Sequence, residues 1–228
     1  MRVAKVRNSL ETLSKIGIGV NSIIDVGIQH STPVLMELFP NLHHYLFEPV
    51  EEYFPHIRQN YANLKYELVH AAVTDFDGKV SLKTEKKTRG DEISHSYVVE
   101  DETPETRSVP AIQLDSFFAK KQNAGPFFLK IDVEGPDVPG AILAGAQSVL
   151  QNTHAVMIEM TVDKFMERAS LLHKAGFDIW DICDLCYYGD CLWQADVVFV
   201  RRELKNSNLD LRPMHRPPFQ PELWQSGF

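Results

Sequence analysis

Residues 126–135 read PFFLKIDVEG, an apolar run of strand length that ends in two acids. Two similar runs precede it, SIIDVG at residues 22–27 and HHYLFEP at residues 43–49. Apolar runs of this length are typical of strands buried inside a sheet. Helical patterns separate them, as in STPVLMELF at residues 31–39. The alternation predicts βα units, a parallel sheet and therefore an α/β fold.

The rest of the chain extends this pattern to about seven strands. An Asp77-Gly78 pair predicts a tight hairpin turn. Residues 84–108 are polar, and we expect an irregular loop there that binds an acceptor or acts as a lid. The further strands expected are Lys65–Val73, Val80–Leu82, Ala155–Met160, Phe177–Cys183 and Ala195–Arg201, and the further helices are Val50–Tyr61, Ile112–Lys120, Val138–Leu150 and Val162–Ala175.

The sequence predicts three segments along the chain. Residues 1–20 carry apolar side chains at helical spacing, which indicates an N-terminal helix. Residues 21–202 hold the alternating strands and helices of the main domain. Residues 203–228 are rich in proline, which disfavours a helix or a central strand. This tail either wraps the domain or mediates association into a homodimer.

Composition narrows the class of protein. The 228 residues carry a formal net charge of −8, which opposes binding to a nucleic-acid backbone. No stretch approaches the roughly 20 apolar residues of a membrane span, and no signal-peptide core is evident, so we expect a cytoplasmic protein. The cysteines at 183, 186 and 191 lack a fourth zinc ligand nearby, so we expect reduced thiols and no metal.

Two predicted strands end in groups suited to a cofactor. Glu48 follows Gly27 by 21 residues, close to the interval at which an acid at the end of the second strand accepts hydrogen bonds from ribose hydroxyls. The loop after Gly27 reads IQHST and has no GxGxxG pattern, which argues against a nicotinamide or flavin dinucleotide. The sequence therefore favours a cofactor that has a ribose but no pyrophosphate.

These stretches resemble the FkbM family of S-adenosylmethionine-dependent methyltransferases. The motifs that carry the resemblance are IIDVG at 23–27, FEP at 47–49, HAAVTDFDG at 70–78, LKIDVEG at 129–135, AILAGAQSVL at 141–150 and IEM at 158–160. The likeness spans roughly residues 22–202, and LKIDVEG is its most specific part.

The resemblance implies a Rossmann-like class I methyltransferase fold. Its sheet has seven mostly parallel strands with a reversed last strand, and helices cover both faces. The cofactor implied is S-adenosylmethionine. The residues implied at the cofactor are Asp25 and Gly27 in the turn, Glu48 and Pro49 at the ribose, and Ala72 and Val73 near the adenine. Asp132 and Glu134 are implied at the floor of the active site.

One loop departs from the family pattern. Family members follow DVG with Ala or Asn and a second glycine, whereas this chain continues with Ile28, Gln29, His30 and Ser31. A second glycine would let the backbone approach the cofactor without a Cβ. Two interpretations stay open. Either Gln29 or His30 supplies cofactor contacts in a reshaped loop, or the domain has lost affinity for the cofactor.

The candidate catalytic residues are Asp132, Glu134 and His95. Asp132 and Glu134 stand at positions i and i+2 of one strand and so point to the same face. They could act on an acceptor hydroxyl, or they could cap the next helix or bind Lys130. They could also hold a divalent cation, for which no third ligand is evident. His95 lies in the polar segment, where an imidazole is either a general base or simply solvated.

The sequence thus predicts an O-methyltransferase that uses S-adenosylmethionine and acts on a hydroxyl of a sugar or another small molecule. N-methylation is the alternative within the same fold. A non-catalytic binding module that has lost the cofactor is the alternative from a different class.

Overall fold

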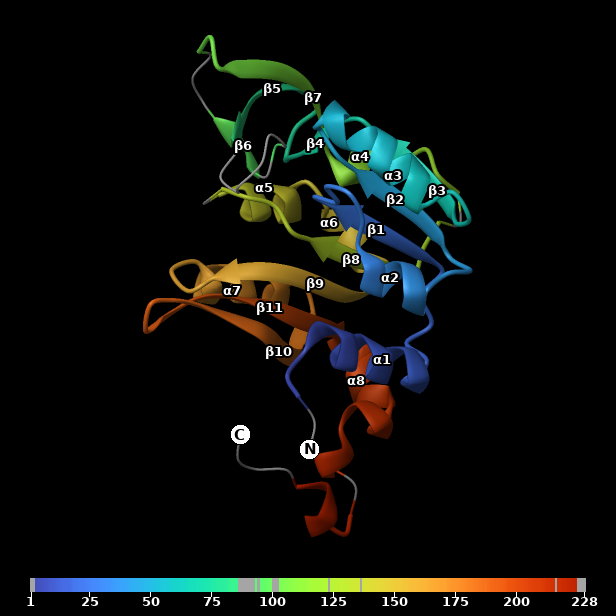
Figure 1. Ribbon diagram of the computed structural model, residues 1–228. Coiled ribbons are helices and arrows are strands. Elements are labelled where there is room, and N and C mark those ends of the chain that lie inside the picture. Colours follow the sequence, from blue (N-terminus) through green and yellow to red (C-terminus); the bar gives the residue numbers. More distant parts are fainter. Residues whose placement is uncertain are drawn as a thin grey trace. The chain divides into compact units, whose positions relative to one another are not determined.

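The computed structural model describes residues 3–85, 93, 95–99, 103–122, 124–135, 137–215 and 217–224 (Figure 1). The chain forms two compact units. One comprises Val20–Thr153, and the other combines Met1–Gly19 with His154–Phe228. In the part of the chain that is described, no helix combines the length and the apolar character needed to cross a bilayer.

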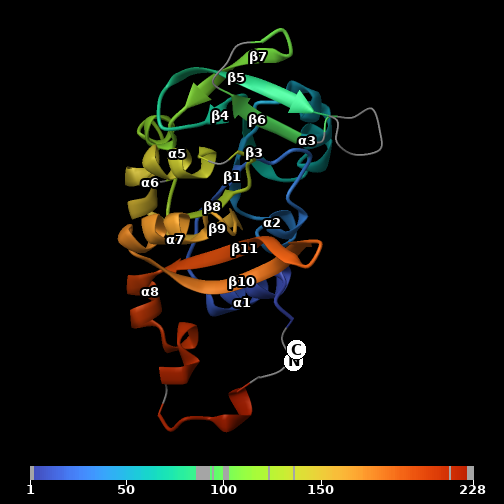
Figure 2. The same cartoon turned by 90° about the vertical axis from the view of Figure 1, so that its left-hand side faces the viewer.

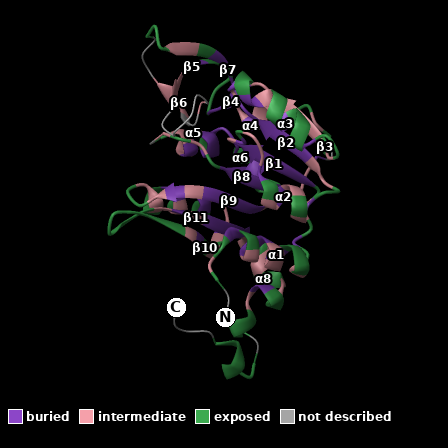
Figure 3. Ribbon diagram, viewed as in Figure 1, coloured by how far each residue is buried: buried purple, intermediate pink, exposed green. Residues whose placement is uncertain are grey.

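The unit Val20–Thr153 contains four parallel strands in the order β8-β1-β2-β3. These are β1 (Ser22–Val26), β2 (His43–Phe47), β3 (Lys65–Val69) and β8 (Phe127–Ile131). Every residue of β1 and β8 is buried, and both strands are coloured as buried in Figure 3. This burial explains why their sequences are continuous apolar runs, and it confirms the strands predicted from SIIDVG, HHYLFEP and PFFLKIDVEG.

Short helices connect these strands. They are α2 (Pro33–Leu38), the 3-10 turn η1 (Glu51–Tyr53), α3 (Phe54–Asn60), α4 (Leu114–Phe118), α5 (Val138–Ala144) and α6 (Gln147–Gln151). The single helix predicted over Val138–Leu150 is wrong, because the chain breaks at Gly145. A Cβ at Gly145 would collide with the backbone of Thr74, so this close approach requires glycine and interrupts the helix.

A second sheet of four strands occupies much of the segment between β3 and β8. Its strands are β4 (Ala72–Val73), β5 (Gly78–Glu85), β6 (His95–Val99) and β7 (Thr106–Ile112), in the order β4-β7-β5-β6. They lie side by side in Figures 1 and 2. Residues 84–108 are therefore not one irregular loop, because strands run through their described parts.

Two further predictions in this region are corrected. The strand predicted over Lys65–Val73 splits, since β3 ends at Val69 and β4 belongs to the second sheet. The Asp77-Gly78 pair does not close a hairpin, because β4 pairs with β7 and not with β5. The physical reason is burial: Val80 and Leu82 of β5 pack into an apolar cluster with Ile57 and Tyr61, so their register follows that core.

The other unit holds three strands in the order β10-β11-β9. They are β9 (Thr153–Thr161), β10 (Phe177–Tyr188) and β11 (Cys191–Arg201). The last strand, β11, runs antiparallel to both β9 and β10. With the four parallel strands of the first unit, these make seven strands with a reversed last one, which confirms the predicted Rossmann-like fold class. The helices here are α1 (Val6–Ile16), α7 (Phe165–Lys174) and α8 (Arg202–Ser207).

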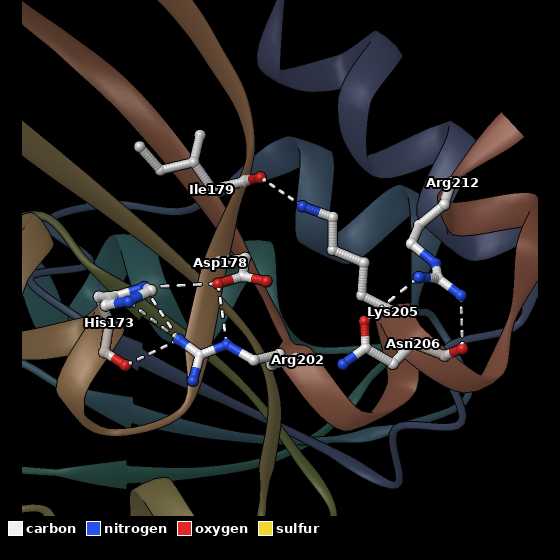
Figure 4. A network of polar contacts seen from close by, with 7 residues as sticks. All are labelled: His173, Asp178, Ile179, Arg202, Lys205, Asn206 and Arg212. Carbon is white, nitrogen blue, oxygen red and sulfur yellow. Dashed lines mark hydrogen bonds and ion pairs between the residues drawn. The ribbon is translucent and has the colours of Figure 1, made fainter. Parts of the chain in front are cut away.

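Polar contacts tie α8 to β10 (Figure 4). The Arg202 guanidinium donates through Nε to Asp178 Oδ1 at 3.1 Å and also contacts His173, while Lys205 Nζ donates to the carbonyl of Ile179 at 3.1 Å. The described part of the tail thus begins with a short helix before its proline-rich part. Among the residues described beyond α8, the chain forms three 3-10 turns, namely η2 (Leu209–Leu211), η3 (Pro213–His215) and η4 (Pro221–Leu223).

Candidate active site

The carboxyl ends of β1, β2 and β8 meet at one cavity within the unit Val20–Thr153. This is the end of a parallel sheet at which ligands bind in open α/β folds. Residues from the second sheet close the cavity on its other side. It is lined by Val26, Gly27, Gln29, Phe47, Glu48, Pro49, Ala71, Ala72, Val73, Leu82, Ser96, Tyr97, Val98, Asp132, Val133, Glu134 and Val138.

Glu48 is the buried acid of this cavity, with 2% of its surface exposed. Its Oε2 accepts a hydrogen bond from the backbone N–H of Gln29 at 2.8 Å, and its Oε1 accepts one from Val50 at 2.8 Å. Burial raises the pKa of Glu48 to about 7, although the two N–H donors act in the opposite direction. Each carboxylate oxygen keeps a further lone pair that can accept a hydroxyl.

The loop after β1 forms a turn although it lacks the second glycine of the family pattern. Gln29 adopts a left-handed backbone conformation with φ of 52°, which glycine adopts more readily than other residues. This conformation points its N–H at Glu48, and Gln29 lines the cavity. His30 instead packs edge-on against the rings of Tyr53 and His56, with both centroid distances at 4.8 Å. Of the two residues predicted to replace the glycine, Gln29 therefore lies at the cavity.

A buried lysine joins two of the predicted acids. Lys130 Nζ lies 3.0 Å from Asp25 Oδ1 and 3.4 Å from Asp132 Oδ2, and it donates to the carbonyl of Gly27 at 2.9 Å. Burial works against the charge of Lys130, but the two carboxylates outweigh it and raise its pKa above the usual range. Both Lys130 and Asp25 are nearly inaccessible, with 3% and 0% exposed.

The sequence offered Lys130 as a partner of Asp132, and the structure has that pair, but the pairing of Lys130 with Asp25 was not predicted. A signal was present, because Lys130 is the one charged residue inside the apolar run PFFLKI. A lysine there must be paired to be buried. Asp25 and His30, both in the described part of the chain, are not among the residues that line the cavity. Asp25 contributes instead to the ion pair beneath the turn.

Gly27 lets two backbone segments approach each other. It has a φ of 78°, and a Cβ at this position would overlap the carbonyl oxygen of Asp132. Its own N–H donates to the carbonyl of Phe47, and the N–H of Asp132 donates to the carbonyl of Val26. These bonds continue the β8-β1-β2 ladder up to the cavity, so the turn after β1 is held close to Asp132.

Apolar side chains form the opposite wall of the cavity. Ala72 and Val73 belong to β4, and both are buried. They lie at the cavity together with Leu82 of β5 and Val98 of β6. An apolar wall of this kind suits a planar base. Ala72 and Val73 thus reach the cavity from the second sheet, not from the end of β3 as the sequence predicted.

Asp132 and Glu134 line the cavity, but they do not lie within a strand as predicted, because β8 ends at Ile131. The Asp132 side chain is 46% exposed, so it is accessible from solvent. Glu134 forms a parallel β-bridge with Tyr97 of β6, which brings the second sheet against the end of β8. Tyr97 was not predicted from sequence. His95 pairs through its backbone with Glu85, and its side chain lies outside the described residues.

Solved structures with related architecture are distant in sequence. A fibrillarin pre-rRNA processing protein from Methanococcus jannaschii gives a TM-score of 0.47 at 13% identity, over 80% of this chain and 66% of that one. An rRNA methylase from Streptococcus thermophilus gives 0.48 at 9% identity, over 84% and 94%. A magnesium protoporphyrin IX methyltransferase from Synechocystis with bound S-adenosylmethionine gives 0.43 at 9% identity, over 86% and 80%.

No curated protein matches the sequence. The family model described as the methyltransferase FkbM domain does match, over residues 18–182. This range covers well over half of the 228 residues and includes every residue predicted at the site. The chain therefore belongs to the FkbM methyltransferase family, with S-adenosylmethionine as its cofactor.

Proposed function

We propose that this protein transfers a methyl group from S-adenosylmethionine to a hydroxyl of a sugar or a related small molecule. The observation that supports this most is that one cavity is lined by a buried acidic residue and by an exposed one. Glu48 is buried in its wall, and Asp132 is about half exposed beside it. A buried carboxylate suits recognition of a ribose, whereas an exposed one suits proton transfer with an incoming acceptor.

The residues at the cavity fit this cofactor. We propose that Glu48 accepts hydrogen bonds from the ribose hydroxyls, with Gln29 and Pro49 beside it. Ala72 and Val73 would contact the adenine. When bound, the cofactor supplies a methyl group on a sulfonium, which is already activated for transfer. Because Gln29 keeps the turn and its bond to Glu48 without a second glycine, the loop supports retained binding over a module that has lost the cofactor.

The acceptor side depends on the acids after β8. We propose that Asp132 or Glu134 takes the proton of the acceptor hydroxyl, a role worth about 10²- to 10⁴-fold in rate for a positioned base. Lys130 Nζ lies 3.4 Å from Asp132 Oδ2, and this ion pair would hold the Asp132 carboxylate in position. His95 stays a proposed alternative base. Alignment of the acceptor oxygen with the methyl group would supply the larger share of the rate enhancement.

Two broader expectations belong to the same proposal. We expect the protein to act in the cytosol, where the free cysteines Cys183, Cys186 and Cys191 stay reduced. Association into a homodimer stays a prediction.

A transfer assay tests the proposal. Methyl-labelled S-adenosylmethionine is incubated with the protein and a series of neutral sugars, with simple amines in parallel. We expect label on sugar hydroxyls and a loss of at least 100-fold in kcat for Asp132→Asn or Glu134→Gln. Asp190→Asn, in the exposed β10–β11 turn, is the matched control and should keep full activity. Label found only on amines, with a rate that rises through the amine pKa, would establish N-methylation instead.

A further inference from the structure

The loop after β1, residues 28–32, contains a left-handed residue at the point where the family pattern has its second glycine. That residue is Gln29, with a φ of 52°. A side chain makes this backbone conformation unfavourable, so it persists only where the surrounding structure fixes it. The contacts around the loop therefore indicate what replaces the glycine in this chain.

Two hydrogen bonds hold the loop to the end of α3. The Asn60 side chain donates through Nδ2 to the carbonyl of His30 at 3.1 Å. The backbone N–H of Thr32 donates to the hydroxyl of Tyr61, the residue that follows α3, at 3.2 Å. Thr32 and Tyr61 are both buried, so solvent has little access to replace this second bond if the hydroxyl is removed. The backbone just beyond Gln29 is thus fixed at two points.

Packing adds contacts from the same stretch of chain. Ile28 is buried in one apolar cluster with Tyr53 and Tyr61. The His30 ring packs edge-on against the rings of Tyr53 and His56, both at a centroid distance of 4.8 Å. The residues on either side of position 29 are therefore held by η1, by α3 and by the residue after α3.

We propose that Asn60 and Tyr61 are positioning residues for the cofactor, and that they act through the backbone of Gln29. They hold the loop in the conformation in which Gln29 N–H donates to Glu48 Oε2, and this bond fixes the carboxylate at the cavity. A glycine at position 29 would adopt the same conformation without such support. The effect on the cofactor rests on the proposed cofactor site at Glu48, whereas the effect on the loop does not.

Hydrogen exchange of the Gln29 amide, followed by NMR in the free protein, tests the effect on the loop without any ligand. Asn60→Ala and Tyr61→Phe each remove one hydrogen bond to the loop, and Tyr61→Phe keeps the buried ring. We expect each to speed this exchange at least fivefold relative to amides of β1, which report global opening, because the bond to Glu48 opens more often.

Gln59→Ala is the matched control, since Gln59 is the exposed residue before Asn60 in α3. It should leave the exchange of the Gln29 amide unchanged. Wild-type exchange rates in both Asn60→Ala and Tyr61→Phe would overturn the proposal.

Calorimetry with S-adenosylhomocysteine tests the effect on the cofactor. Asn60→Ala and Tyr61→Phe should each weaken binding about three- to tenfold, the usual effect of one hydrogen bond. Gln59→Ala should bind like wild type. In a Gln29→Gly background the first two changes should weaken binding less than twofold, because glycine adopts the left-handed conformation unaided.

A general loss of stability would weaken binding equally in the two backgrounds, and that result would overturn a role through Gln29. If wild type fails to bind S-adenosylhomocysteine while Asn60→Ala and Tyr61→Phe still speed the exchange of the Gln29 amide, the loop contacts stand and the proposed function fails.

Discussion

Charged side chains are buried in one part of the molecule and exposed in another. The first part is the parallel strands β1, β2 and β8, and the second is the inserted strands β5, β6 and β7. In the first group Lys130 and Asp25 are buried and paired at 3.0 Å. In the second group Lys83 also has two acidic partners, but its side chain is 32% exposed, and that of Glu105 is 76% exposed. Buried pairs are costly to break, whereas exposed pairs contribute little to stability. The paired charges of the first region therefore hold its strand ends in place, whereas those of the second region can be changed at little cost in stability.

The largest expected effect contrasts the two lysines. Lys130→Met leaves Asp25 buried without its cation and should lower the free energy of unfolding by about 3–5 kcal/mol. Lys83→Met, in the exposed cluster, should lower it by less than about 1 kcal/mol. Urea unfolding followed by circular dichroism measures both. A double variant, Lys130→Met with Asp25→Asn, should recover part of the loss, because it removes both charges together. Equal effects of the two lysine variants would contradict the comparison.

A pair of glycines gives the next largest contrast. Gly27→Ala introduces a Cβ into the carbonyl of Asp132 at a φ of 78°, so we expect roughly 2–4 kcal/mol of destabilisation. Gly78→Ala, at the start of β5, meets only ordinary van der Waals contact with the ring of Phe76. It should change stability by less than about 1 kcal/mol. Thermal unfolding compares the two, and a tolerated Gly27→Ala would show that the turn is looser than the structure indicates.

The buried acid Glu48 should make the free energy of unfolding depend on pH. Burial raises the pKa of this carboxyl from 4.5 to about 7, so the folded protein holds a proton that the unfolded chain releases at lower pH. The contribution of Glu48 to the free energy of unfolding is fully present below about pH 4.5 and is lost as pH rises through about 7. The loss is at most about 3 kcal/mol. Urea unfolding between pH 5 and 8 should show a smaller decline for Glu48→Gln, and identical slopes would count against a raised pKa.

The smallest effect concerns the loop after β1. Gln29→Gly removes a side chain from a left-handed conformation, and the gain is offset by the entropy of glycine in the unfolded chain. We expect a net stabilisation of about 0.5 kcal/mol. Affinity for S-adenosylhomocysteine reports separately on the Gln29 side chain. A fall in affinity would show that this side chain contributes contacts, and a rise would show that it obstructs the cavity.

The two regions were not equally predictable. The strands β1, β2 and β8 followed from their apolar runs, because a strand buried on both faces leaves little room for polar residues. The sequence predicted the centre of β5, Val80–Leu82, as a strand, but it predicted residues 84–108 as a loop because they are polar, and β6 and the start of β7 lie there. Their apolar residues Val98 and Val109 pack with Val80 and Leu82 in one cluster, a tertiary feature that residue spacing does not encode.

The candidate site shows the same limit. Glu48, Asp132 and Glu134 come directly after strands, and the parallel topology brings them to one cavity as predicted. Tyr97 could not be predicted, because it reaches the cavity through an isolated bridge between β6 and Glu134, which lies beyond the end of β8. Asp25 has the right position in sequence, but its side chain turns to Lys130. Which face of a strand carries a ligand depends on packing that residue spacing does not encode.

Calorimetric titration with S-adenosylhomocysteine tests the central claim, that the cavity around Glu48 is the cofactor site. We expect micromolar binding by wild type and at least tenfold weaker binding by Glu48→Ala, a difference of about 1.4 kcal/mol. Glu52→Ala, four residues away in η1 and paired with Arg107 at the surface, is the control and should bind like wild type. Absence of binding up to millimolar concentration, or equal binding by wild type and Glu48→Ala, would contradict the account.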